Sequence, residues 1–539
     1  MNCPDACSNH QPARIRELTL PARLAELLDP DVNRMKSPQS QIPVTTLFLL
    51  CCLTTGCGQS ESSVNDDLKS GRHSSTVSSD TINDPEPSPQ ETSPDLFVDA
   101  ANSTATANKV GTSTPANLSP PRHRLPDNRP DLNPQRQAAA RIQRLQSDHL
   151  ILLTDRATDS IEDLPALADE LFEYLQHVCG PLSPAPDGAE FQVTGFLMVD
   201  ENRFTSAGLI PPQVVGMRHG QQFGYSFWIR NQEDDYYLRH LLLHEFVHCY
   251  MTCETRQPDI PPAWFMEGAA EIFATHRRAL SGTTFGVLPE NHGGFEGWGR
   301  ISEIGRRLSG AATDEVTAQT VPPLEAVLLP AVSLIRDDAR YAYWWALCWM
   351  LSTHPEYSGD WAALCRCRGQ ARFSSTMARL LTRAGHRLRA DWLLFAESVC
   401  VGFDPTRSYP VHRSISNAPD SEFKLSAGAG WQDSGHVLQQ GMNCDIVCRG
   451  SCILATTTAP WVTEPQGITL EYSMGRPLGE VLAVIVDGET GWISRRVPLG
   501  RGRRFVVPHS GRLWLQINDS AAQRADNSGS FTVSVRTGG

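Results

Sequence analysis

Residues His244-Glu245-Phe246-Val247-His248 form an H-E-x-x-H motif, the part of the chain best suited to do chemistry. Positions i and i+4 of a helix lie on one face, so both imidazoles can reach one metal ion. Glu245 then lies beside that ion, where a general base for water is needed. The motif therefore predicts a zinc site with His244 and His248 as ligands.

A catalytic zinc site needs a third protein ligand and keeps its fourth position open. Eighteen residues after His248, the sequence Trp264-Phe265-Met266-Glu267-Gly268-Ala269-Ala270-Glu271 offers Glu267 as that ligand. Glu271 follows at i+4 on the same helical face, where a carboxylate can accept the second N–H of a ligating histidine. The alternative is a histidine pair on a solvated helix face. The apolar residues around both motifs instead favour buried helices.

This arrangement resembles the gluzincin metallopeptidases, and within them the aminopeptidase branch and its bacterial relatives of unknown specificity. The resemblance covers roughly residues 145 to 415 and rests on H-E-x-x-H, the eighteen-residue gap and W-x-x-E-G-x-A-E. It implies that His244, His248 and Glu267 bind zinc, that Glu245 deprotonates water and that peptides or proteins are substrates. The upstream G-A-M-E-N signature is missing, so endopeptidase activity or an unknown specificity is expected.

Several further expectations concern the parts that surround this site. Residues 223 to 229 read as a strand, and Gly224 to Trp228 is the candidate sheet edge for an extended substrate, with a plain buried strand as the alternative. In related gluzincins a tyrosine or histidine stabilises the oxyanion. Tyr341 is the first candidate here and Tyr343 the second, with a core aromatic helix as the alternative. His276 reads as a helix-terminal cation or a surface residue.

The N-terminal part predicts export. Residues 1 to 34 read as a mis-assigned start, and residues 35 to 57 resemble a bacterial lipoprotein signal that ends in a lipidated Cys57. Residues 58 to 140 are rich in Ser, Thr, Pro, Asn and Asp, which predicts a disordered tether. We therefore expect an exported protein of the bacterial cell envelope, anchored to a membrane by lipid. Some disulfides are expected after export, with Cys249 and Cys253 as packed thiols.

Composition and spacing divide the rest into two domains. Hydrophobic residues make up 40% of the chain, enough for packed cores, and the net charge of −13 argues against nucleic acid as a partner. Strand and helix patterns over 141–418 predict an α+β zincin-like domain. Residues 419–539 contain short β-type runs between turn residues, which predicts an all-β sandwich: 468–472, 482–486, 504–507, 513–517 and 531–535.

The C-terminal segment resembles the soluble galactose-binding bacterial lectins that hold sugar hydroxyls through calcium. The resemblance runs from Trp431 to Val535 and includes the ending N-D-x6-D-N-S-G-S. It implies that Asp519, Asp526 and Asn527 supply oxygens to Ca²⁺ and that glycans are partners, whereas the alternative is a β-sandwich without a ligand. Together the motifs predict a zinc peptidase with a carbohydrate-binding-like module. The alternative is a non-catalytic adhesion lipoprotein with a peptidase-like scaffold.

Overall fold

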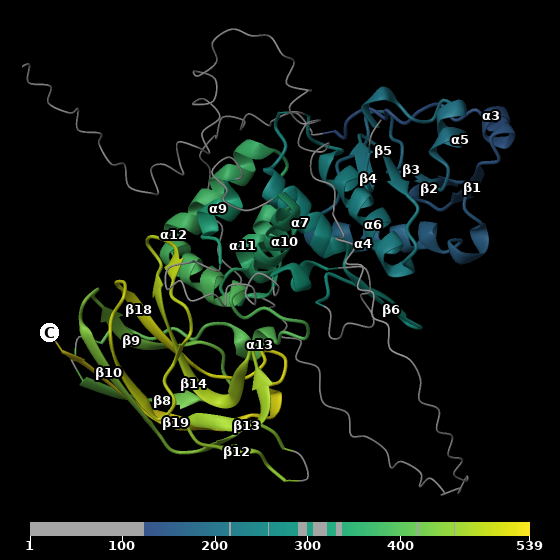
Figure 1. Ribbon diagram of the computed structural model, residues 1–539. Helices are drawn as coiled ribbons and strands as arrows, with labels where there is room; N and C mark the ends of the chain where they lie inside the picture. Colours follow the sequence, from purple (N-terminus) through teal and green to yellow (C-terminus); the bar gives the residue numbers. More distant parts are fainter. Residues whose placement is uncertain are drawn as a thin grey trace, which may run out of the picture. The chain divides into compact units, whose positions relative to one another are not determined.

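The computed structural model describes residues 123–538, except 215–216, 257, 289–298, 305–320, 330–336, 417, 419 and 457–458. The N-terminal extension, the signal with Cys57 and residues 58–122 of the expected tether lie outside the described residues. Within the described part, an α+β region is followed by an all-β region, in agreement with the expected fold class (Figure 1). No described helix is both long enough and apolar enough to span a bilayer.

A mixed sheet forms the framework of the α+β region. Its strand order is β1-β2-β3-β5-β4: β2, β3 and β5 run parallel, and β1 and β4 flank them antiparallel. Every residue of β2 and β3 is buried, as expected for central strands covered on both faces. The bounds are β1 (Gln143–Gln146), β2 (Leu150–Thr154), β3 (Val193–Met198), β4 (Gly220–Phe223) and β5 (Ser226–Arg230).

The structure corrects the expected substrate edge. Most of Gly224 to Trp228 belongs to β5, which is paired on both sides, by β3 and by β4. The edge strand beside β5 is β4, whose sequence Gly220-Gln221-Gln222-Phe223 has no apolar alternation and was missed for that reason. The exposed edge is thus four residues earlier in the chain than expected.

Two helices carry the motif residues. Helix α6 (Asp235–Thr252) begins where the Asp234 carboxylate accepts a hydrogen bond from the Tyr237 N–H, which caps its first turn. Most of its side chains are buried, and it packs against β4, β5, α4 (Leu164–Cys179) and α7 (Ala263–Ala274). Helix α7 follows Pro262, whose fixed backbone suits a helix start.

A helical layer follows the two motif helices. Helix α10 (Asp337–Thr353) lies directly on α7, because Gly268 has no side chain. A Cβ there would come within 2.5 Å of the Trp344 carbonyl oxygen. The remaining described elements of this region are η2 (Thr158–Ser160), α5 (Glu201–Ser206), η3 (Pro212–Val214), β6 (His276–Ala279), β7 (Gly282–Phe285), α9 (Leu324–Leu328), α11 (Ser358–Cys365) and α12 (Gln370–Ala396).

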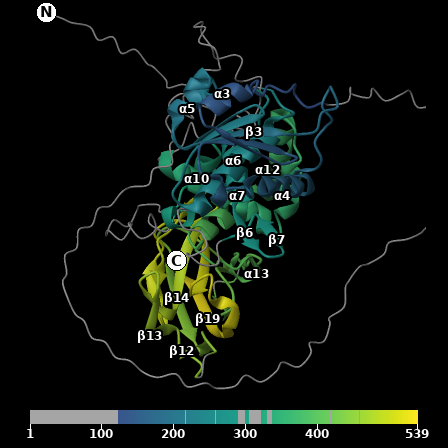
Figure 2. The same ribbon diagram turned by 90° about the vertical axis from the view of Figure 1, so that its right-hand side faces the viewer.

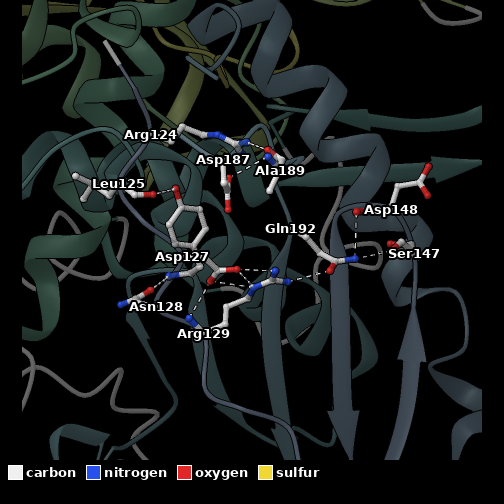
Figure 3. Close-up of polar contacts among 11 residues, drawn as sticks. Arg124, Leu125, Asp127, Asn128, Arg129, Ser147, Asp148, Asp187, Ala189 and Gln192 are labelled. Carbon is white, nitrogen blue, oxygen red and sulfur yellow. Dashed lines mark hydrogen bonds and ion pairs between the residues drawn. The ribbon is translucent and has the colours of Figure 1, made fainter. Parts of the chain in front are cut away.

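The segment before β1 is part of the fold, although the sequence pattern assigned it to the tether. Helix α3 (Pro134–Ala139) is capped by Asn133, and the Leu125 N–H donates to the Cys253 carbonyl. Tyr225 fixes the same segment, because its hydroxyl donates to the Leu125 carbonyl and its N–H to Asn128 Oδ1 (Figure 3). These contacts use backbone and polar groups, so the segment lacks the apolar periodicity of an ordinary domain start.

The all-β region consists of two sheets with a common core (Figure 2). One has the order β12-β11-β19-β10-β17 with β8 beside β19, and the other β13-β14-β18-β9 with β15 and β16 beside β14. The bounds are α13 (Pro405–Ser408), β8 (Asp420–Ser426), β9 (Gln432–Leu438), β10 (Asn443–Arg449), β11 (Cys452–Ile453), β12 (Val462–Thr463), β13 (Gln466–Ser473), β14 (Arg476–Asp487), β15 (Trp492–Ile493), β16 (Val497–Pro498), β17 (Gly502–Val506), β18 (Gly511–Ile517), η5 (Arg524–Asp526) and β19 (Ser528–Gly538).

The described cysteines are free thiols, in contrast to the expected disulfides. Cys249 and Cys253 are buried thiols of the α6 end, as expected. Cys444 and Cys448 likewise point into the core of the all-β region, where burial raises the pKa of each to about 12. These sulfur atoms act as small apolar groups of the packing.

Candidate metal centre

Two facing helices bring histidines and glutamates together at matching intervals. Helix α6 carries His240, His244 and His248, one per turn, and α7 carries Glu267 and Glu271 at the same spacing. Because α6 and α7 pack against each other, the two rows meet. Within the described residues, two overlapping groups could hold a metal ion: His244, His248 and Glu267, and His240, His244 and Glu271.

The first group has the spacing of a tetrahedral zinc site. His244 Nε2 lies 3.0 Å from His248 Nε2, and Glu267 Oε2 lies 3.3 Å and 3.4 Å from these two nitrogens. Zinc bonds of 2.0–2.1 Å place neighbouring tetrahedral ligands about 3.3–3.4 Å apart. The side chains of His248 and Glu267 are 12% and 21% exposed, so the group can be reached from solvent. The predicted ligand residues therefore fit a zinc ion.

The second group is enclosed and its carboxylate is already occupied. Glu271 Oε2 lies 3.3 Å from His240 Nε2, and Glu271 Oε1 lies 3.7 Å from His244 Nδ1. Arg300 contacts the same two oxygens, with Nε 3.0 Å from Oε2 and Nη2 2.6 Å from Oε1. The side chains of His240 and Glu271 are each 3% exposed. Glu271 is therefore the carboxylate behind His244, at the position expected for a residue that orients a ligand.

The charges of the two glutamates are fixed by their neighbours. Burial alone raises the pKa of Glu267, but the facing His248 and His244 outweigh it and hold that pKa well below its ordinary value. Burial also opposes ionisation of Glu271, whose pKa is nevertheless kept well below the ordinary value by Arg300 and His240. Both carboxylates are thus ionised at neutral pH, as metal ligation and imidazole orientation require.

Glu245 follows His244 on α6 and faces the exposed sheet edge. Its side chain is buried, which raises its pKa to about 8 although His248 opposes the shift. A Cβ on Gly220 of β4 would lie 2.5 Å from Glu245 Oε1, so the glycine leaves the space that the carboxylate fills. Strand β4 is also tied to α6 by a 3.1 Å hydrogen bond from Gln222 Nε2 to Thr252 Oγ1. The candidate base therefore lies directly beside the edge strand.

The two tyrosine candidates occupy different environments on α10. Tyr343 is buried and packs edge-on against Trp392, so it is a core residue. Tyr341 is half-buried, and its ring centre lies 5.2 Å from Arg300 Cζ. Because Arg300 is bound to Glu271, Tyr341 is connected to the site through that arginine.

Sequence analysis missed three residues of this site. His240 could have been found, since it precedes His244 by four residues on the same face of α6. Arg300 lies 29 residues after Glu271, so no local spacing connects the two residues. Gly220 gives no signal before the strand order is known.

His276 was expected at the surface or as a helix-terminal cation, and this expectation was wrong. The ring is buried and stacked on Tyr236 at 4.7 Å. Nδ1 lies 2.8 Å from the Ala274 carbonyl, and Nε2 accepts a hydrogen bond from Arg239 Nε. Burial lowers the pKa of His276 to about 3, so the imidazole is neutral.

The acidic loop of the all-β region has a different organisation. Asn527 Nδ2 donates to Asp519 Oδ2 at 2.7 Å, so the amide presents a donor to that carboxylate. Asp526 is exposed, and its Oδ2 accepts from the Thr456 N–H. The buried Arg524 donates from Nη2 to the Asp519 carbonyl and from Nη1 to Ser408 Oγ. Because an amide N–H and a guanidinium face the groups that calcium would need, these residues do not form an oxygen cage as they stand.

A cavity of about 300 Å³ lies elsewhere in the α+β region, between residues 124–127 and 185–192. Arg129 bridges two of its lining residues, with Nη2 2.7 Å from Asp127 Oδ2 and Nη1 2.9 Å from Gln192 Oε1 (Figure 3). No described residue of the two histidine–glutamate groups lines this cavity. The metal groups and the cavity are therefore separate features.

Comparison with known proteins assigns no family to the chain. No protein-family model matches it, and no curated protein matches it. Among solved structures, the N-terminal domain of EclA, a PllA-like lectin, is similar, with 23% identity over 22% of this chain and 95% of that chain, at a TM-score of 0.18. The histidine–glutamate groups are therefore interpreted from their own geometry.

Proposed function

We propose that this protein is a zinc-dependent hydrolase that cleaves peptide bonds. The observation that carries the proposal is the triangle of His244 Nε2, His248 Nε2 and Glu267 Oε2, whose sides of 3.0, 3.3 and 3.4 Å match the edges of a tetrahedral zinc site. A bound zinc ion supplies Lewis acidity, which polarises a carbonyl oxygen and makes water more acidic.

Glu245 is the proposed general base and general acid. Its carboxylate accepts a proton from the attacking water and passes it to the leaving amine. A raised pKa suits both steps, since a group near neutrality can take and return a proton. Tyr341 is the proposed donor to the carbonyl oxygen, a role that rests on the sequence resemblance.

Strand β4 is the proposed docking edge for an extended peptide. One side of β4 pairs with β5, and Gly220 brings its backbone against Glu245. A peptide that adds to a sheet edge is held by main-chain hydrogen bonds, which are largely independent of side chains. This mode predicts cleavage of unfolded or extended segments.

Export with lipidation at Cys57 and glycan binding by the all-β region also remain proposals, supported by the sequence resemblances alone. Radiolabelled palmitate tests the first, with Cys57→Ser as the control. Retention on galactose-agarose tests the second. Retention without any hydrolytic activity would favour the alternative of a non-catalytic adhesion protein.

The decisive experiment measures zinc content and peptide cleavage on the same purified full-length samples. We expect one zinc in the wild type, loss of zinc and activity in Glu267→Ala, and zinc without activity in Glu245→Gln. Glu173→Gln is the matched control, since Glu173 is an exposed carboxylate on α4. A wild type that cannot be loaded with zinc would contradict the proposal.

A further inference from the structure

The two candidate metal groups share one histidine, whose ring nitrogens face different carboxylates. His244 Nε2 lies 3.3 Å from Glu267 Oε2, and His244 Nδ1 lies 3.7 Å from Glu271 Oε1. A histidine of this kind could bridge two metal ions. By residue type, α6 and α7 alone therefore offer a dinuclear centre, with His248 and Glu267 on one side and His240 and Glu271 on the other.

Arg300 breaks the equivalence of the two sides. Its guanidinium contacts both oxygens of Glu271, at 2.6 Å and 3.0 Å, in the bidentate geometry that matches a carboxylate. One wall of this position is the Tyr341 ring, 5.2 Å from Arg300 Cζ. The arginine side chain is 13% exposed, so the ion pair is largely desolvated. Glu271 already has a cation at the place where it could contact a second metal ion.

We infer that Arg300 acts as a fixed cation in the second histidine–glutamate group and restricts the protein to one metal ion. It is a positioning residue: it holds Glu271, and Glu271 in turn faces His244 Nδ1 and His240 Nε2. The metal is thereby directed to His244, His248 and Glu267. This inference rests on the proposed metal site of those three residues.

Removing the charge should open the second group. In Arg300→Met, the buried Glu271 keeps its two imidazole neighbours but loses the guanidinium, and removal of one member of a buried ion pair is costly. A divalent ion can then take the place of the guanidinium between His240, His244 and Glu271. Arg300→Lys keeps a positive charge, so it should continue to exclude the second ion even though it loses the bidentate contact.

Metal stoichiometry of the full-length chain tests the inference, by titration with Co²⁺ and by zinc analysis after equilibrium dialysis. We expect one equivalent for the wild type and Arg300→Lys, two for Arg300→Met, and one again for Arg300→Met combined with His240→Ala. The absorption of Co²⁺ should show a second tightly bound ion in Arg300→Met alone. Circular dichroism confirms that each variant is folded.

The possible failures are distinguishable. A wild type without any bound metal contradicts the proposed function itself. One equivalent in both the wild type and a folded Arg300→Met overturns the role of Arg300 and leaves the proposed function intact. If Arg300→Met does not fold, Arg300→Gln, which keeps hydrogen-bond donors without the charge, replaces it: two equivalents support the inference, and one equivalent overturns it.

Discussion

Two arginines, the half-buried Arg300 of the α+β region and the buried Arg524 of the all-β region, each lie beside a buried acidic residue but leave it in different surroundings. Arg300 satisfies Glu271, whereas the three ligand atoms of His244, His248 and Glu267 face one another. Arg524 lies within the loop of Asp519, where Asn527 and the Ser520 N–H already donate to the carboxylate. A ligand set whose acceptor atoms are available can hold a metal ion, whereas a carboxylate already filled by the loop's own donors has no free place for one.

The comparison predicts that removal of zinc has a large effect and that removal of calcium has none. The effect of zinc is the largest expected here. Treatment with 1,10-phenanthroline should abolish hydrolysis, and loading with zinc at 1,000 times its Kd should stabilise the protein by about 4 kcal/mol. Calcium and EGTA should leave the melting temperature unchanged. Scanning calorimetry with each ion and chelator checks both. A melting temperature that rises with calcium would show that the Asp519 loop rearranges to bind it.

The next largest effect is expected from substitution of Arg524, which tests whether its charge stabilises the loop around Asp519. Burial lowers the pKa of Arg524 to about 10, so the guanidinium is still charged at neutral pH. Arg524→Met leaves Asp519 buried without this charge and should cost about 3 kcal/mol of the free energy of unfolding. Urea unfolding measures the loss. Arg504→Met, at an exposed arginine of β17, should have little effect.

A substitution at Gly220 should have a smaller effect, and it distinguishes the role of the base Glu245 from that of the metal ligands. A Cβ at 220 would displace the Glu245 carboxylate, which lies 2.5 Å away, and its three nearest atoms all belong to Glu245. Gly220→Ala should therefore lower kcat by roughly tenfold to a hundredfold while zinc content stays unchanged. Gly359→Ala is the control, because nothing lies within 4 Å of its Cβ position. If kcat is unchanged in Gly220→Ala, the proposed position of the Glu245 carboxylate beside β4 is contradicted.

The site residues differ in how far the sequence could predict them. His244, His248, Glu267 and Glu271 follow from helical periodicity, since spacings of four residues fix a shared face before any fold is known. The five predicted runs of the all-β region overlap β13, β14, β17, β18 and β19, whereas β8 to β12 were not predicted. Arg300 and Gly220 depend on which distant segments meet, and a single sequence does not contain that information. Strand β4 was missed because its glutamines lack a β pattern.

Burial was harder to predict than secondary structure. His276 and the segment from 123 to 140 are polar in sequence, but backbone carbonyls and stacked rings satisfy them in the fold. The same holds for Asp519 and Asn527, whose residue types suggest a cation while their hydrogen bonds supply donors. Residue type indicates which groups need partners, and the packing decides which partners they receive.

The predicted effect that is smallest at neutral pH concerns His276. Its imidazole faces an arginine, whereas the imidazoles of α6 face carboxylates. Burial lowers its pKa to about 3, far below that of an exposed histidine. The unfolded chain therefore takes up a proton at His276 before the native state does, and stability is lost as the pH falls through about 6.5 toward 3. The loss should approach about 1.4 kcal/mol per pH unit in that window.

Urea unfolding of His276→Gln against the wild type from pH 8 to pH 4 measures this effect, because glutamine keeps a donor and an acceptor but does not titrate. We expect a shallower pH dependence in the variant at unchanged zinc content. His177→Gln, at a histidine of the last turn of α4, is the matched control. Equal slopes in His276→Gln and the wild type would mean that Arg239 and Tyr236 tolerate a charged imidazole, and that the neutral state of His276 does not contribute to stability.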